Sequence, residues 1–490
     1  MTLIRIHERD NVAVALRELK QGETVSLPWG GDLTIKEDIP VSHKVSLEDL
    51  AQDQTIVRYG QPIGEAVSAV PKGSWIHTHS LKLPDKIKAE PEPASGFAVL
   101  EGYGPSTFPG FTRPKGPAGI RNHLLILPTV ACACGVVRAI GQALPEAVTL
   151  EHGHGCGRAG KDHQRTLAVL EGIGANPNVG AVLLVGLGCE AVNGEKLAEK
   201  IASSGRPIEY LEIQKSGGSR LTTAKGIDLA KALMKNISSQ KKEPHPISEI
   251  ILGLQCGGSD ALSGVTANPA VGLASDWIIS QGGTAVLAET TEMIGTTHLL
   301  QARAAAEEVA RDIHEMITNA EAAIRKQLGE YAHLAIAPGN MDGGLSSIME
   351  KSLGCITKGG NSPIQEVIEY AQPPTRKGLV LMDTPGYDIE SLGGLVAGGA
   401  QVILFTTGRG SPVGTPVSST IKVASNSDLW QRMEDDMDLN AGQIADGART
   451  LKEMGMELID LVMEVLGGKL TKSEENQQEV LGFSMTGQAG

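Results

Sequence analysis

Aromatic side chains, long apolar runs and an excess of positive charge are all scarce in this chain. Phe, Trp and Tyr make up 3% of the 490 residues, so the core must be built mainly from aliphatic side chains. The longest apolar run, residues 124–137, is interrupted at Pro128 and falls short of the about 20 residues that cross a membrane. The net charge of −14 lacks the basic face that nucleic-acid binding requires. We therefore expect neither a membrane partner nor a nucleic-acid partner.

Cysteine is also sparse, with six residues and no CxxC pair. The first ten residues carry charges at Arg5, Glu8, Arg9 and Asp10, which interrupt any secretory apolar segment. These features predict a cytoplasmic protein without a disulfide framework. Single cysteines of such a chain are often small buried apolar side chains, and Cys132 and Cys134, which lie in an apolar segment, are interpreted as packing residues.

Glycine is abundant, at 60 residues, which is about 12% against a usual ~7%. Residues 1–82 contain short β-type runs bounded by Gly, Pro or Asp, although residues 10–19 show helical periodicity. A proline-rich segment, 83–117, predicts an extended linker. Beyond it, Val- and Leu-rich runs alternate with helical segments, which predicts an α/β body with mainly parallel sheets. We divide this body into a core, 118–375, and a C-terminal α/β domain, 376–490.

Polar, glycine-rich segments follow five of the predicted strands. In open α/β sheets, ligands bind beyond the carboxyl ends of the strands. A single polar segment at the exit of a strand, directly after its last residue, is an ordinary turn. Five such exits predict one polar pocket. The strands are 181–186, 249–254, 285–288, 379–382 and 402–406, and their exits include Cys189, Cys256, Glu289, Glu292 and Arg409.

The segment 152–160 contains two histidines, a cysteine and a literal GxGxxG motif. The motif is a weak indication of dinucleotide binding, because Arg158 stands where a small apolar residue is expected. His152, His154 and Cys156 can instead converge on a metal or a substrate, or face solvent in an ordinary loop. His77 and His79 share one face if they lie on a strand, so they pose the same two alternatives.

Several further loops combine hydroxyl, amide and glycine groups, which suits a ligand with many hydroxyls. The Arg409 guanidinium can hold a carboxylate in a bidentate geometry, and Lys358 can do likewise or act as a base. The residues that we predict to bind substrate are Asn122, Ser259, Asp260, Asn268, Asn340, Thr406, Thr407 and Arg409.

Taken together, these segments resemble the altronate/galactarate dehydratase family over nearly the whole chain. Residues 1–82 are similar to the SAF-type domain at the N-terminus of that family. His77-Thr-His79 resembles the altronate branch, whereas the stretch from Asn268 resembles the galactarate branch. The segments that carry the likeness include 119–122, 153–156, 186–190, 255–260, 264–269, 338–340, 350–354 and 405–410.

The resemblance implies an iron-dependent hydro-lyase that converts a sugar acid to a 2-keto-3-deoxy acid. Removal of the weakly acidic C2 proton builds an enediolate, which needs a cation and fixed donors. Loss of the C3 hydroxyl needs a general acid or a Lewis acid. His154, His77 and Lys358 are the catalytic candidates. A single Fe²⁺ is the first expectation and a [4Fe–4S] cluster the alternative, and the candidate ligands are Cys156, Cys189, Cys256, His77 and His79.

Three other functions remain open from the sequence. A related lyase expels another C3 group, such as sulfite from sulfolactate, but relatives of that type are usually split into two chains. A non-catalytic sugar-acid-binding protein of the same fold is a second alternative. A nicotinamide-dependent oxidoreductase, based on the glycine motif, is the third. We expect a small-molecule substrate and a homodimer.

Overall fold

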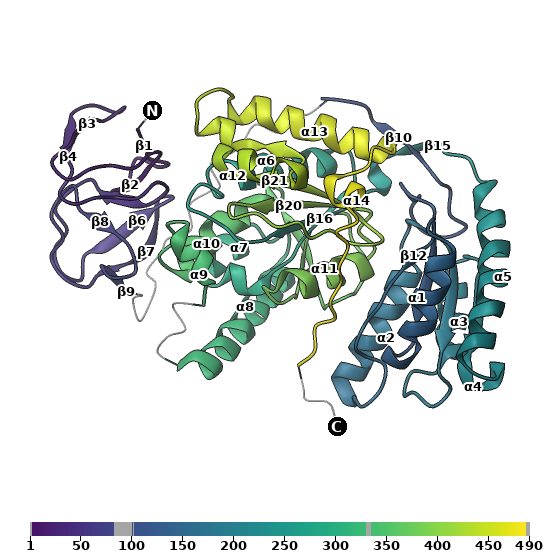
Figure 1. Cartoon of the computed structure of the whole chain (residues 1–490). Coiled ribbons are helices and arrows are strands. Elements are labelled where there is room, and N and C mark those ends of the chain that lie inside the picture. Colours follow the sequence, from purple (N-terminus) through teal and green to yellow (C-terminus); the bar gives the residue numbers. More distant parts are fainter. Residues whose placement is uncertain (1, 83–99, 101, 330–334, 487–490) are drawn as a thin grey trace.

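The computed structural model describes residues 2–82, 100, 102–329 and 335–486. A small β domain, at the left of Figure 1, leads into an α/β body that contains two separate parallel sheets. This confirms the predicted fold class. No described helix is both long and apolar enough to cross a membrane.

The N-terminal domain is built almost entirely from short antiparallel strands. Its main sheet has the order β1-β2-β5-β8, a second has the order β6-β7-β9, and β3 pairs with β4. The helical periodicity of residues 10–19 is misleading, because the alternating Val and Ala residues of β2 are buried between neighbouring strands. The strands are β1 (Leu3–Ile4), β2 (Val12–Ala15), β3 (Thr24–Ser26), β4 (Asp32–Thr34), β5 (Lys44–Ser46), β6 (Thr55–Arg58), β7 (Gln61–Ala66), β8 (Trp75–Ile76) and β9 (Leu81–Lys82).

The segment predicted as a linker lies partly outside the described residues. Its C-terminal part is not a free spacer, because β10 (Thr107–Gly110) pairs with β15 (Glu243–Pro246) in an antiparallel ribbon. Phe108 is buried there, and the Trp277 indole donates a hydrogen bond to the carbonyl of Tyr103. This part of the segment therefore packs on the body.

The first parallel sheet has the strand order β12-β11-β13-β14. Its central strands are apolar and buried on both faces, as expected for a sheet covered by helices. Its elements are β11 (His123–Pro128), α1 (Cys134–Ala143), β12 (Val148–Thr149), α2 (Gly160–Gly174), β13 (Val179–Gly186), α3 (Gly194–Ala202), β14 (Ile208–Glu212), α4 (Ile213–Ser216) and α5 (Ser219–Ser238).

The second parallel sheet has seven strands in the order β18-β19-β17-β16-β20-β21-β22. The predicted boundary between residues 375 and 376 falls between β18 and β19, which are hydrogen-bonded neighbours in this sheet. The strands are β16 (Ile251–Cys256), β17 (Thr284–Leu287), β18 (Ile364–Ile368), β19 (Gly378–Met382), β20 (Val402–Thr407), β21 (Ser419–Ala424) and β22 (Leu439–Asn440).

Helices cover both faces of this sheet. A capping box between Thr450 and Glu453 starts α13, and Gly468 ends it in the left-handed conformation. α11 packs against both β16 and α2, so it joins the two sheets through a shared apolar core. The helices are α6 (Ala267–Ser280), α7 (Thr297–Gln301), α8 (Glu307–Leu328), α9 (Pro338–Asp342), α10 (Ile348–Cys355), α11 (Asp388–Ala397), α12 (Ser427–Arg432), α13 (Leu451–Gly467) and α14 (Lys472–Glu475).

Candidate active site

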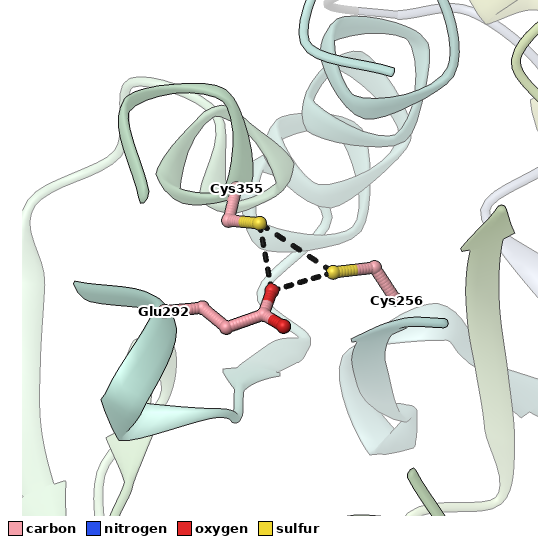
Figure 2. Close-up of side chains that lie close together, drawn as sticks. All are labelled: Cys256, Glu292 and Cys355. Atoms are coloured by element: carbon pink, nitrogen blue, oxygen red, sulfur yellow. Dashed lines mark hydrogen bonds between the residues drawn. The ribbon is translucent and has the colours of Figure 1, made fainter. Parts of the chain in front are cut away.

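Two thiols and a carboxylate meet at the carboxyl edge of the seven-stranded sheet. Cys256 ends β16, Glu292 lies in the 3-10 helix that follows β17, and Cys355 ends α10. Figure 2 shows the three side chains pointing toward one another. Each Sγ lies 2.8 Å from Oε2 of Glu292, and the two Sγ atoms are 3.5 Å apart. All three residues are buried.

Two lysines and a second glutamate surround this group. Lys351 forms an ion pair with Glu292. The Lys358 Nζ lies 2.7 Å from Oε2 of Glu289, and the same oxygen accepts a hydrogen bond of 2.8 Å from the backbone N–H of Cys256. Buried charges are tolerated when they are paired and hydrogen-bonded, so this is an electrostatically organised cluster inside the body.

Burial and the lysines set the protonation of the cluster. Burial, assisted by the neighbouring Glu292, raises the pKa of Glu289 to about 7. Burial also opposes ionisation of Glu292, but the Lys351 and Lys358 ammonium groups and the hydrogen bonds from the two thiols together outweigh it and lower the pKa of that carboxyl. For Lys358, the nearby acidic groups outweigh burial and raise its pKa well above the usual value. The site therefore combines firmly held cations with one carboxyl of perturbed acidity, as catalytic sites do.

Glu289 also has a strained backbone. Its φ of 72° places a non-glycine residue in the left-handed region, and its Oε1 has no hydrogen-bond partner among the described residues. The hydroxyl of Thr384 holds this turn by accepting a hydrogen bond of 2.7 Å from the Glu289 N–H. Strain of this kind, stored in a buried acidic residue, is a feature of functional sites.

The Cys256–Glu292–Cys355 group fits a single metal ion by its chemistry and spacing. One ligand atom from each residue lies within 4.8 Å of the others. Thiolates and a carboxylate are ligands of borderline metals such as Fe²⁺ and Zn²⁺. The thiols already share hydrogen bonds with the carboxylate, and a cation would take the place of those protons.

Ser259 and Asn340, two of the predicted substrate ligands, border this cluster. The Ser259 Oγ lies 3.8 Å from Sγ of Cys256, and the Asn340 Oδ1 accepts a hydrogen bond of 2.9 Å from the Ser259 N–H. Arg409 follows β20 at the same edge, where its N–H bonds the Gly258 carbonyl and its side chain is exposed. These residues form the outer part of the candidate site.

Other predicted substrate ligands are engaged within the protein. The Asp260 carboxylate accepts hydrogen bonds from Ser263, Ser425 and Asn426. These contacts fix the loop that follows β16. The remaining pairings are the Asn268 amide with the Thr406 hydroxyl and the Gly354 carbonyl, and the Thr407 hydroxyl with the Gly258 carbonyl.

Asn122 is not brought to this group. It lies at the amino end of β11, in the other sheet, because it precedes that strand instead of following it. Its amide accepts a hydrogen bond from Arg113 and donates one to the Ile237 carbonyl.

His77 and His79 lie in the N-terminal domain beside Trp75 and His43. The rings of His43 and His77 are 4.8 Å apart, and those of His77 and His79 are 6.5 Å apart. The His77 Nδ1 is buried without a partner among the described residues, and burial lowers its pKa to about 4. Thus His77 is held neutral, which suits a ligand or a proton acceptor.

The histidine group faces the body across one glycine loop. The His43 Nε2 lies 3.3 Å from the carbonyl of Asp342. Gly344 has a φ of +92°, and a Cβ there would lie 2.1 Å from the carbonyl oxygen of Ser42. On its other side, a Cβ on Gly343 would lie 3.0 Å from Cα of Asp260. The loop therefore separates the histidines from the edge that carries Ser259.

Cys156 and Cys189 do not join Cys256, contrary to the predicted convergence. They follow strands of the four-stranded sheet, whereas Cys256 ends a strand of the seven-stranded sheet. The prediction treated all the strands as one sheet. His154 lies with Cys156, and its ring stacks on Phe483 at 5.1 Å.

The sequence interpretation missed Cys355 and Lys351, and gave Glu292 no role beyond a strand exit. Glu289 and Glu292 directly follow a predicted strand, which is the available signal for them. Cys355 and Lys351 come from a helix, α10, that approaches the sheet edge from elsewhere in the chain. No strand exit points to them, and only the tertiary packing brings them to the site.

Comparisons with known proteins cover the whole chain. The SAF domain of altronate/galactarate dehydratases matches residues 1–84, the second domain of D-galactarate dehydratase/altronate hydrolase matches 110–238, and the C-terminal domain of D-galactarate/altronate dehydratase matches 247–488. An altronate dehydratase of Bacillus subtilis is 37% identical over 99% of both chains. A galactarate dehydratase (L-threo-forming) of Escherichia coli is 37% identical over 95% of this chain and 93% of its own.

The two subunits of another enzyme match separate parts of this chain. The β subunit of a (2R)-sulfolactate sulfo-lyase from Chromohalobacter salexigens is 32% identical over 75% of this chain and 94% of its own. The α subunit is 38% identical over 16% of this chain and 89% of its own. This chain therefore combines in one polypeptide the parts that are separate in that enzyme.

Proposed function

The chain belongs to the altronate/galactarate dehydratase family, and we propose that it dehydrates a sugar acid to a 2-keto-3-deoxy acid. The full-length relatives confirm the predicted resemblance, and the hydro-lyase class holds for the family. The observation that supports the assignment to this chain is the buried group of two thiols, two glutamates and two lysines at the carboxyl edge of the seven-stranded sheet. The choice between altronate and galactarate stays open.

The chain's own residues match the demands of the reaction. Proton removal at C2 places negative charge on the substrate carboxylate, and fixed cations in a water-poor site stabilise such charge. We assign this electrostatic role to Lys351 and Lys358. Glu289, whose Oε1 has no partner in the described part of the chain, is the candidate for moving a proton, and the Lys358 ammonium holds its other oxygen. Arg409, at the exposed rim, is the candidate clamp for a carboxylate.

We propose that Cys256, Glu292 and Cys355 hold a single divalent metal, with Fe²⁺ as the family expectation. When bound, the metal supplies Lewis-acid assistance to departure of the C3 hydroxyl. His77 and His79 belong to a separate group across the 342–344 loop, so in this proposal they line the approach to the site and do not complete the ligand set.

Elimination of sulfite from sulfolactate is the second candidate, because both subunits of the sulfo-lyase match successive parts of this chain. The distinction lies in the substrate. A hexonate or hexarate presents several hydroxyls to Ser259, Asn340 and Arg409 at the border of the cluster, whereas a three-carbon acid can contact fewer of these groups.

A substrate panel tests the proposal. Purified protein is supplied anaerobically with Fe²⁺ and offered altronate, galactarate, their stereoisomers, sulfolactate and malate, and 2-keto-3-deoxy acid and sulfite are measured. We expect turnover of a hexonate or hexarate and a far lower kcat/KM for malate. Sulfite release without dehydration would establish the second candidate, and comparable kcat/KM for malate would refute the assignment of a sugar acid. A cytoplasmic location and a homodimer stay predictions.

A further inference from the structure

Three neighbouring loops at the carboxyl edge of the four-stranded sheet carry one cysteine each. Cys156 follows β12, Cys132 follows β11 and Cys189 follows β13. These strands are adjacent in the order β12-β11-β13. Neighbouring strands lie ~4.8 Å apart, so the three loops leave the sheet within about 10 Å of one another.

Hydrogen bonds tie the loops together beyond the sheet. The Ala131 N–H donates to the His154 carbonyl at 2.9 Å, and the Ala191 N–H donates to the Gly155 carbonyl at 3.2 Å. The Thr129 hydroxyl donates to the Glu190 carboxylate at 2.5 Å. Each of the three loops is therefore bonded to a neighbour within a few residues of its cysteine.

Glycine permits the closest of these approaches. Gly155 has a φ of +102°, and a Cβ there would lie 2.2 Å from the carbonyl oxygen of Thr129. Any other side chain would push the Cys156 loop away from the loop that carries Cys132. A glycine at position 155 therefore allows the two cysteine-bearing loops to approach each other closely.

The three thiols face solvent, unlike Cys256 and Cys355. Cys132, Cys156 and Cys189 are all exposed, so none of them fills the core as a small apolar residue, and the predicted packing role of Cys132 is wrong. α1 begins at Cys134 and α2 at Gly160, so two helix N-termini lie at this edge, and their dipoles favour nearby negative charge. Exposed thiols on neighbouring loops beside helix N-termini suit anionic sulfur ligands.

We infer that Cys132, Cys156 and Cys189 bind an iron–sulfur cluster, with one iron left without a protein thiolate. Thiolates are the usual ligands of such clusters. Among the described residues, only Cys256, Glu292 and Cys355 bring three such ligand atoms within 4.8 Å of one another, so Cys132, Cys156 and Cys189 are not spaced for a single ion. A cubane spreads its ligands farther apart, because each thiolate binds a different iron. Of the three ligands, Cys132 replaces the Cys256 of the sequence-based prediction.

The C-terminal tail places this edge beside the candidate active site. The Gly482 N–H bonds the Ile389 carbonyl at the start of α11, and the next residue, Phe483, stacks on His154. Gly257, which follows β16, lies close to the first residue of α11, because a Cβ on Gly257 would lie 3.1 Å from Oδ2 of Asp388. The two carboxyl edges are therefore linked through a few contacting residues, and a role of the cluster in dehydration rests on the proposed function.

Cluster content tests the inference without reference to activity. The full chain is reconstituted anaerobically with Fe²⁺ and sulfide, and bound iron, acid-labile sulfide and visible absorption are measured. We expect iron and sulfide in near-equal amounts. Cys132→Ser, Cys156→Ser and Cys189→Ser should each lose most of the sulfide and the absorption. Cys134→Ser, in the same segment as Cys132, is the matched control and should keep both, as should Cys355→Ser.

Several outcomes would overturn the inference. They are iron without sulfide in the wild type, full sulfide in all three serine variants, an equal loss in Cys134→Ser, or a disulfide between two of the three cysteines in reduced protein. Far-ultraviolet circular dichroism establishes that each variant is folded. Failure to bind sulfide on reconstitution, in a protein that still dehydrates a sugar acid, would refute the cluster and leave the proposed function intact. A protein that binds the cluster but turns over no sugar acid would support the inference and refute the proposed function.

Discussion

The two carboxyl edges of this molecule use cysteine in opposite ways. In the seven-stranded sheet, Cys256 and Cys355 are buried among paired charges, with Sγ atoms 3.5 Å apart. In the four-stranded sheet, three cysteines are exposed on loops joined by backbone hydrogen bonds. The residue type is the same, but the first edge holds its cysteines close together in a low-dielectric interior and the second holds them on exposed loops. Burial and spacing, more than the presence of cysteine, decide which chemistry each edge can support.

The largest effect should follow from breaking the buried charges at the first edge. Lys358→Met removes the cation that pairs with Glu289, and both partners are fully buried. An uncompensated buried charge costs about 3–5 kcal/mol, and loss of one fixed group that stabilises developing charge typically lowers kcat about 10²–10³-fold. We expect kcat to fall by at least about 100-fold, measured with the substrate that the panel identifies.

The control for Lys358→Met is Lys20→Met, which removes an exposed lysine that pairs with Glu18 and Asp38. Exposed pairs contribute about 0–1 kcal/mol, so this variant should keep both rate and stability. Urea unfolding of both variants separates instability from loss of chemistry. If folded Lys358→Met kept the wild-type kcat, the lysine would have no role in the reaction.

The next effect concerns how the N-terminal domain is held beside that edge. Glu350, on α10, forms ion pairs with Lys44 and Arg58, and all three side chains are buried. Glu350→Gln leaves two buried cations without their counter-charge, so we expect a loss of about 3–5 kcal/mol of unfolding free energy. Lys351 is the next residue along α10, so kcat should fall as well. Unchanged stability would show that the two domains are held by other contacts.

The same carboxylate predicts how stability depends on pH. Burial opposes ionisation of Glu350, but Lys44 and Arg58 outweigh it and lower its pKa from 4.5 to about 2. The unfolded chain therefore binds the proton first as the pH falls, so this contribution is complete above pH 4.5 and is lost between pH 4.5 and about 2. The full shift corresponds to about 3 kcal/mol. The stability difference between wild type and Glu350→Gln should shrink below pH 4.5, and a constant difference down to pH 3 would contradict the assignment.

The sequence predicted much of the architecture because its strongest signals are local. Buried apolar runs predicted the strands β13, β16, β17, β19 and β20 within a few residues. Their polar exits gave Cys256, Ser259 and Arg409 at one edge. The pairing of strands across the chain was not available, so two sheets were treated as one and Cys256 was grouped with Cys156 and Cys189. Cys355 was missed for the same reason, since a helix distant in sequence brings it to Glu292.

A smaller effect should follow from loosening the tail that links the two edges. Phe483 is 3% exposed, and its ring stacks on those of His152 and His154 at 4.9 and 5.1 Å. Phe483→Leu keeps most of the apolar volume but loses the stacking, which is worth about 0.5–1.5 kcal/mol. We expect a loss of that order in thermal or urea unfolding. Val480→Ala, at an exposed residue of the same tail, is the control and should change stability by less than about 0.5 kcal/mol.

The smallest effect separates the two kinds of cysteine without any metal. In the metal-free protein, Cys132→Ser changes an exposed side chain, so its unfolding free energy should stay within about 0.5 kcal/mol of wild type. Cys256→Ser places a hydroxyl in a fully buried position, where a polar group that is imperfectly bonded costs about 1–3 kcal/mol. Urea unfolding in the presence of a chelator and a reductant measures both. Equal losses for the two variants would mean that Cys132 is packed like Cys256, and the distinction between a buried edge and an open one would fail.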